Sequence, residues 1–95
     1  MFLAHLHYQR PFDVVQLHVE AHRSYLETLY ASGKLIVSGP KMDKSGGIIL
    51  FATTDRQEVE AIISKDPYYT LDLATYEVIE FNPVKYDAKF ADLYL

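Results

Sequence analysis

The order of strand-like and helix-like segments is the feature that most constrains the fold of this chain. Apolar and polar side chains alternate over Phe2–Gln9, which is the period of a strand with one buried face. Helical spacing of apolar residues follows, with Asp13 placed to cap a helix and Gly33 placed to end it in a left-handed conformation. The pattern therefore predicts a first strand and then one continuous helix over residues 13–32.

Two short strands are expected after this helix. Leu35–Ser38 is a buried strand that should stop at Gly39-Pro40, and Gly47–Thr53 is the next strand after an intervening loop. These two segments are close enough in the chain to form a hairpin.

The last part of the pattern contains another helix and another strand. Thr54 or Asp55 opens the second helix, which should stop at Asp66 because the residue before a proline is disfavoured in helical geometry. Leu73–Phe81 then has the composition of a fourth strand. The resulting β-α-β-β-α-β order predicts an α+β fold, the ferredoxin-like sandwich built on a split βαβ unit.

One face of such a sheet carries both helices, and nothing in the chain covers the other face. An uncovered apolar sheet face is an association surface, so we expect a homodimer or a higher even oligomer. The length of 95 residues predicts a single domain with a core over residues 1–83. Aromatic side chains at helical spacing in residues 84–95 indicate a C-terminal tail that docks on the domain or on a partner copy.

The composition excludes several classes of function. A net charge of −4 disfavours nucleic acid as a partner, and the absence of cysteine excludes disulfides, thiolate metal sites and a cysteine nucleophile. No stretch approaches the roughly 18 apolar residues of a membrane helix, and the first ten residues lack the apolar core of a signal peptide. We therefore expect a soluble, cytoplasmic protein without a nucleic-acid or membrane partner.

His22 is the first candidate for chemistry. It lies in line with Val15, Leu26 and Leu29 on the apolar stripe of the first helix, so its side chain should point toward the sheet. Imidazole changes its charge near neutral pH, which suits it to carry a proton. The alternative interpretation is a core histidine whose ring is satisfied by a backbone carbonyl.

Asp66 is the second candidate. At the carboxyl end of a helix the partial negative charge of the carbonyls disfavours another anion, so this position indicates a role beyond the helix itself. A carboxylate here can orient a histidine, as in triad-like arrangements, and we expect it to remain near solvent. The alternative interpretation is a plain helix stop, because Asp-Pro commonly begins a turn.

The four histidines also allow a metal site. His5 and His7 share a strand face, while His18 and His22 share a helix face one turn apart, and two such pairs can converge as imidazole ligands. Strand histidines at this spacing also arise by chance, and the glutamate between the helix histidines does not fit the H-E-x-x-H motif. We therefore expect no metal and no cofactor.

Several short motifs in this sequence recur together in a known family. The chain resembles the YciI-like family from its first strand to Pro83, and the motifs that carry the resemblance are, in order, HRSYL at His22–Leu26, SGKL at Ser32–Leu35, SGP at Ser38–Pro40, DPY at Asp66–Tyr68 and the strand around Tyr76–Val78.

The resemblance implies a ferredoxin-like dimeric α+β barrel with a pocket between helices and sheet. It also implies a His–Asp dyad, carried here onto His22 and Asp66, and cofactor-free acid–base chemistry. A relative in chlorinated-aromatic breakdown acts as a dehydrochlorinase, and the fold is similar to that of muconolactone isomerase. On this reading, the residues that line the pocket and bind substrate are Ser38, Gly39, Pro40 and Tyr68.

One position departs from the family pattern. Many members carry an arginine three residues before the histidine, where this chain has Val19, so a substrate carboxylate would need Arg10 or Arg23 instead. The sequence thus predicts a small cofactor-independent lyase or isomerase acting on a small organic substrate. The alternatives are a non-catalytic dimeric module that binds a small metabolite and a histidine-ligated metal protein.

Overall fold

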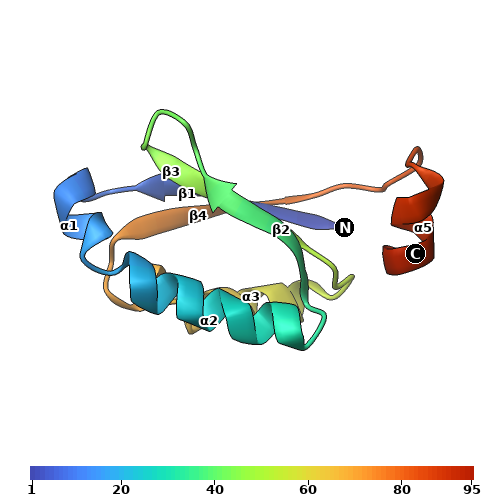
Figure 1. The fold of residues 1–95 in the computed structure, drawn as a ribbon, viewed down its shortest axis with the longest axis horizontal. Helices are drawn as coiled ribbons and strands as arrows, with labels where there is room; N and C mark the ends of the chain where they lie inside the picture. The colour runs from blue at the N-terminus through green and yellow to red at the C-terminus, as the bar shows by residue number, and fades with distance from the viewer.

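The computed structural model describes residues 1–95 and shows one layer of strands with helices packed beneath it (Figure 1). The elements, in chain order, are β1 (Phe2–Tyr8), α1 (Phe12–Gln16), α2 (Val19–Ala31), β2 (Leu35–Pro40), β3 (Gly46–Phe51), α3 (Arg56–Ser64), α4 (Pro67–Thr70), β4 (Ala74–Glu80) and α5 (Ala88–Tyr94).

The four strands form one sheet in the order β2-β3-β1-β4, and every neighbouring pair is antiparallel. β3 therefore lies between β1 and β2, the two strands that α1 and α2 connect, which is the split βαβ arrangement. The predicted ferredoxin-like α+β fold is confirmed.

The strand alternation divides the sheet into two different faces. Phe2, Ala4 and Leu6 of β1 point to the helix side and are at most 2% exposed, and they join a core cluster of 14 buried residues. Leu3, on the other side of β1, pairs with Leu50 of β3 and with Ile79 of β4. We call this second side the open face, because no helix lies over it (Figure 1).

The first helical segment differs from its prediction. Instead of one helix over residues 13–32, α1 and α2 are separated by a break at Leu17 and His18, and Asp13 lies inside the first turn of α1 and is not its cap. Pro11 stands at that cap, with φ −55° and ψ 147°, and a carboxylate in the first turn still suits the helix dipole. The break lets α1 bury Val15 while α2 takes its own direction across the sheet.

One strand boundary also differs from the prediction. Gly39-Pro40 does not stop the second strand, because β2 runs to Pro40, which pairs with Gly47. β2 is an edge strand, and an edge tolerates a proline that cannot donate to the ladder. Gly33 ends the α2 segment at φ 74°, as predicted for a left-handed helix stop.

The C-terminal segment extends away from the layered body. α5 lies beyond one end of the sheet, at the end of an extended arm, and packs against neither layer of its own chain (Figure 1). Its aromatic side chains contact one another at a tilt, with the ring centroids of Phe90 and Tyr94 5.2 Å apart. None of the helices combines the length and the apolar character that a membrane span requires.

Candidate active site

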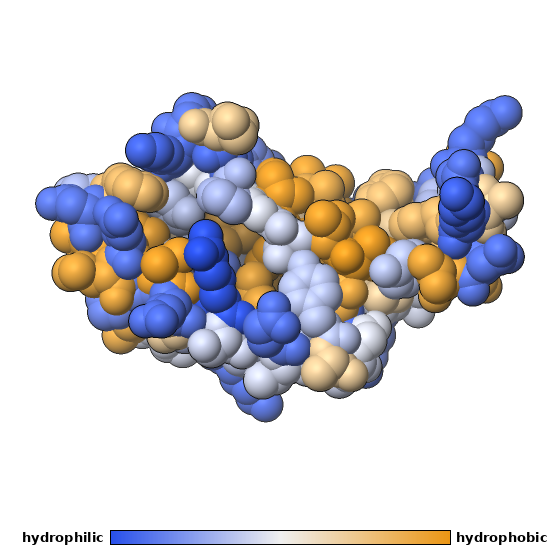
Figure 2. Space-filling model, viewed as in Figure 1, coloured by the Kyte–Doolittle hydropathy of each residue, from blue (hydrophilic) through white to orange (hydrophobic).

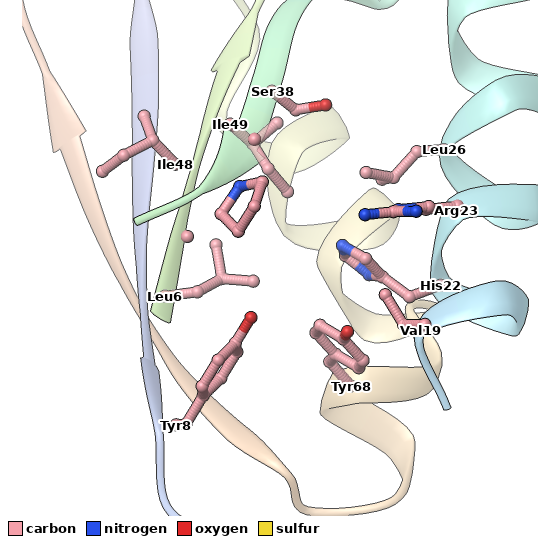
Figure 3. A pocket seen from close by; sticks show the side chains of 13 residues that line it. Leu6, Tyr8, Val19, His22, Arg23, Leu26, Ser38, Ile48, Ile49 and Tyr68 are labelled. Atoms are coloured by element: carbon pink, nitrogen blue, oxygen red, sulfur yellow. The ribbon is translucent and has the colours of Figure 1, made fainter. Parts of the chain in front are cut away.

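A cavity of about 220 Å³ opens between α2 and the helix-facing side of the sheet. Figure 3 shows Leu6 and Tyr8 on one wall, His22, Arg23 and Leu26 on the opposite wall, and Tyr68 at the base. The remaining lining residues are Val19, Ser38, Gly39, Pro40, Gly47, Ile48 and Ile49. The cavity thus has an apolar interior, with a few polar groups that converge on it from different elements.

His22 and Asp66 meet at one edge of this cavity. The ring Nδ1 of His22 lies 2.8 Å from Oδ1 of Asp66, and the two side chains are only 12% and 2% exposed. A carboxylate only accepts hydrogen bonds, so this contact assigns the Nδ1 proton to the imidazole as donor. Nε2 is then the ring nitrogen left to face the cavity, where it can accept a proton.

Asp66 differs in two ways from its prediction as a helix stop near solvent. It is 1% exposed, and it does not close α3, which ends at Ser64; instead it is the N-cap of α4. Its Oδ1 also accepts the backbone N–H of Tyr68 at 3.0 Å, and Pro67 stands at the first helical position. The cap and the start of a helix favour an anion, which offsets part of the cost of burying this carboxylate.

Tyr68 positions the histidine ring from the other side. The two rings are stacked, with centroids 3.9 Å apart and planes within 3° of each other, and Tyr8 meets Tyr68 edge-on at 5.9 Å. Because Asp66 holds Nδ1 and Tyr68 holds the ring plane, the His22 ring has a defined orientation toward the cavity.

Burial raises the pKa of the tyrosine hydroxyls around this site. For Tyr68 the nearby Tyr8 and the Asp66 carboxylate raise the pKa further, while the Arg23 guanidinium opposes the shift. Burial and then the Asp66 charge also raise the pKa of Tyr76, whose hydroxyl is buried without a hydrogen-bond partner. These phenols stay protonated at neutral pH and can donate hydrogen bonds.

Arg23, one of the two arginines that the sequence offered for a substrate carboxylate, lines the cavity. The residue is exposed, and its side chain runs above His22 with its nitrogen end toward the cavity (Figure 3). Arg10 pairs with Asp72 at 2.9 Å and Arg56 lies 3.8 Å from Glu80, whereas Arg23 has no acidic partner. Periodicity describes where a backbone position faces and does not capture the reach of a long side chain.

The structure brings the other predicted site residues together. Ser38, Gly39, Pro40 and Tyr68 all line the cavity, and the Ser38 hydroxyl is 2.6 Å from the Tyr30 hydroxyl. Tyr8 is a cavity residue that the site prediction omitted, although its place on the same strand face as Leu6 was a usable signal.

The two histidine pairs do not converge on a shared metal site. His5 and His7 lie on the open face of β1, whereas His18 is the N-cap of α2 and His22 points into the cavity on the helix side. The reason is that the sheet itself separates the two pairs.

A family model described as the YCII-related domain matches residues 1–82. This chain belongs to the YCII-related domain family. The resemblance seen in the sequence motifs is thereby confirmed, and the match ends just before the arm that carries α5. No curated protein sequence matches this member of the family.

A solved structure in the same family offers a comparison. The chain is similar to 5-chloro-2-hydroxyhydroquinone dehydrochlorinase from Burkholderia phenoliruptrix, with a TM-score of 0.69 and 26% identity over 86% of this chain and 94% of that chain. That enzyme was solved in complex with 2,5-dihydroxybenzoquinone. Because the similarity covers most of both chains, it concerns the whole ferredoxin-like fold and is not limited to a local motif.

Proposed function

We propose that this YCII-related protein is a small lyase-type enzyme that works without a cofactor on a small hydroxylated ring compound. The observation that carries the proposal is the 2.8 Å contact of His22 with the buried Asp66 at the edge of a cavity. The similar dehydrochlorinase supports the reaction class, since loss of HCl needs a proton acceptor and a leaving chloride but no oxidant or reductant.

In the proposed reaction His22 accepts a proton from the substrate at Nε2. Asp66 keeps the Nδ1 proton in place and offsets the positive charge that forms on the imidazole, as a carboxylate does in a triad. In a chlorinated hydroxyhydroquinone one hydroxyl proton moves to the chlorine-bearing ring carbon and a second hydroxyl proton goes to His22. The C–Cl bond then breaks and chloride leaves as the anion, so that the ring becomes a hydroxyquinone and the net loss is HCl. The neutral hydroxyls of Tyr8 and Tyr68 can donate hydrogen bonds to substrate oxygens.

Chloride release from 5-chloro-2-hydroxyhydroquinone, followed with the purified protein, tests this function directly. Turnover supports the lyase assignment. Tight binding of the ring compound without chloride release favours the alternative, a non-catalytic module that holds a small metabolite.

Arg23 indicates the charge of the ligand in this proposal. An arginine without an acidic partner at the cavity mouth favours an anion, and it takes the place of the family arginine that Val19 replaces here. A hydroxylated quinone is a vinylogous carboxylic acid that ionises readily, so it supplies both the ring and the negative charge.

We therefore expect Arg23→Gln to weaken binding of 2,5-dihydroxybenzoquinone by about tenfold or more, because a charge-assisted hydrogen bond contributes roughly 1.5–3 kcal/mol. Isothermal titration calorimetry measures the effect. Arg10→Gln is the matched control, since Arg10 pairs with Asp72 and does not line the cavity. Equal affinities for the two variants would contradict the role of Arg23.

We also propose that the protein forms a dimer through its open face. A row of apolar side chains crosses all four strands on that face, because Val37 pairs with Leu50, Leu50 with Leu3, and Leu3 with Ile79. Figure 2 shows hydrophobic surface above the helices, toward the arm of α5. Packing two such faces together removes these side chains from water, and it places each α5 within reach of the partner.

The dimer should appear in light scattering as twice the chain mass of 10.9 kDa. Ile79→Lys should shift the protein toward the monomer, because it buries a lysine in the proposed contact. Leu71→Lys is the control, with an original side chain of similar exposure (49% against 45%) that lies at the end of α4, away from the open face. A wild-type monomer at micromolar concentration, or a loss of dimer in both variants, would contradict the proposed interface.

A further inference from the structure

The open face carries a second group of chemistry-bearing side chains, separate from the cavity. His5 and His7 project from β1 on this face, and Glu77 is the residue of β4 directly opposite His5. Side chains two apart on one strand share a face, and a cross-strand partner lies beside them. The three side chains therefore converge because of strand register.

The separations in this cluster are those of ligands around a small cation. Oε1 of Glu77 lies 3.4 Å from Nε2 of His7 and 3.6 Å from Nδ1 of His5, and the three ligand atoms all lie within 4.8 Å of one another. Two atoms bound at 2.0–2.2 Å to a tetrahedral zinc ion are about 3.4 Å apart. Small side-chain rotations would therefore complete the geometry without moving the strands.

His5 has no adequate hydrogen bond within the chain. Its Nε2 is buried without a partner, and its Nδ1 lies 3.6 Å from the carboxylate, which is beyond normal hydrogen-bond distance. Buried polar groups in native proteins rarely lack a partner. A metal ion bound between His5, His7 and Glu77 would give Nδ1 of His5 a partner.

We propose that His5, His7 and Glu77 form a site for a divalent ion of the zinc type on the open face. Two imidazoles and one carboxylate are a donor set that suits zinc, and they leave a fourth position directed outward from the sheet. This inference departs from the expectation of no metal. That expectation paired the histidines with one another and did not include Glu77, which lies far away in the sequence.

The proposal is tested with Zn²⁺ alone on the full-length protein after treatment with a chelator. Calorimetry and elemental analysis should give about one Zn²⁺ per chain, and binding should raise the melting temperature because the ion binds the folded state. Glu77→Gln and His7→Gln should each weaken Zn²⁺ binding by about tenfold or more, since even changes to residues that only hydrogen-bond a metal ligand cost about 10–100-fold. Both residues are about half exposed, so these substitutions leave the core intact.

His18→Gln and His22→Gln are the controls, because neither histidine lies on the open face. Unchanged Zn²⁺ binding in these two variants supports the assigned cluster. The proposal is overturned if the wild type does not bind Zn²⁺ at micromolar concentration, or if Glu77→Gln keeps full affinity. Loss of binding in His22→Gln would also overturn it by moving the ion to the cavity.

Discussion

Replacement of His22 by glutamine is expected to lower turnover by about 10²–10⁴-fold, which is the usual contribution of a positioned acid–base group. Glutamine has a similar size and can still hydrogen-bond to Asp66, but its amide cannot accept and release a proton at neutral pH. The measurement is kcat/KM for chloride release from 5-chloro-2-hydroxyhydroquinone. The melting temperature of the variant should stay close to that of the wild type.

Asp66→Asn separates the proposed role of Asp66 in the reaction from its role in folding. Asparagine is as good a helix N-cap as aspartate, so the start of α4 and its bond from the Tyr68 N–H should persist. Loss of the negative charge removes the group that offsets the imidazolium and that selects the Nδ1 proton. Turnover should therefore fall while binding of 2,5-dihydroxybenzoquinone is largely retained. Full activity in either variant would show that the pair does not carry the reaction.

Gly46→Ala is expected to lower the free energy of unfolding by about 3 kcal/mol or more, at the upper end of overpacking costs. A Cβ at this position would overlap the carbonyl oxygen of Leu6 and lie 2.8 Å from its carbonyl carbon. These are backbone atoms of β1, so the clash cannot be relieved by a side-chain rotation and must displace the pairing of β1 with β3. Leu6 also lines the cavity, so the same change should weaken ligand binding.

Gly39→Ala is the matched control for this prediction. Gly39 lies on the neighbouring edge strand, and an added Cβ would have no atom within 4 Å. The free energy of unfolding of this variant should be unchanged or increase by up to about 1 kcal/mol, because alanine has fewer conformations than glycine in the unfolded chain. Urea unfolding of both variants gives the comparison, and equal midpoints would show that the sheet accommodates a side chain at Gly46.

Local patterns in the sequence were sufficient to predict the order of the four strands and the two main helices, α2 and α3, and the inward direction of His22. Alternation with a period of two along Phe2–Gln9 and helical spacing around Leu26 depend only on which side of an element is buried. The same local rules located Gly33 at a helix end. They did not detect the break at Leu17 and His18, because a helix interruption that redirects two segments across a sheet is decided by packing.

Only the tertiary structure decided how the candidate sites are assembled. His22 and Asp66 are 44 residues apart, and the buried position of Asp66 follows from its cap on α4 and from packing against Tyr68. His7 and Glu77 are 70 residues apart and meet through the register of β1 with β4, which no local pattern encodes. The sequence by itself therefore determined the elements and the family of this protein. The contacts of its carboxylates depend on pairing between distant parts of the chain, which is fixed only when the layers pack together. The approach of Arg23 to the cavity depends on the length of its side chain, which the periodicity of a helix does not describe.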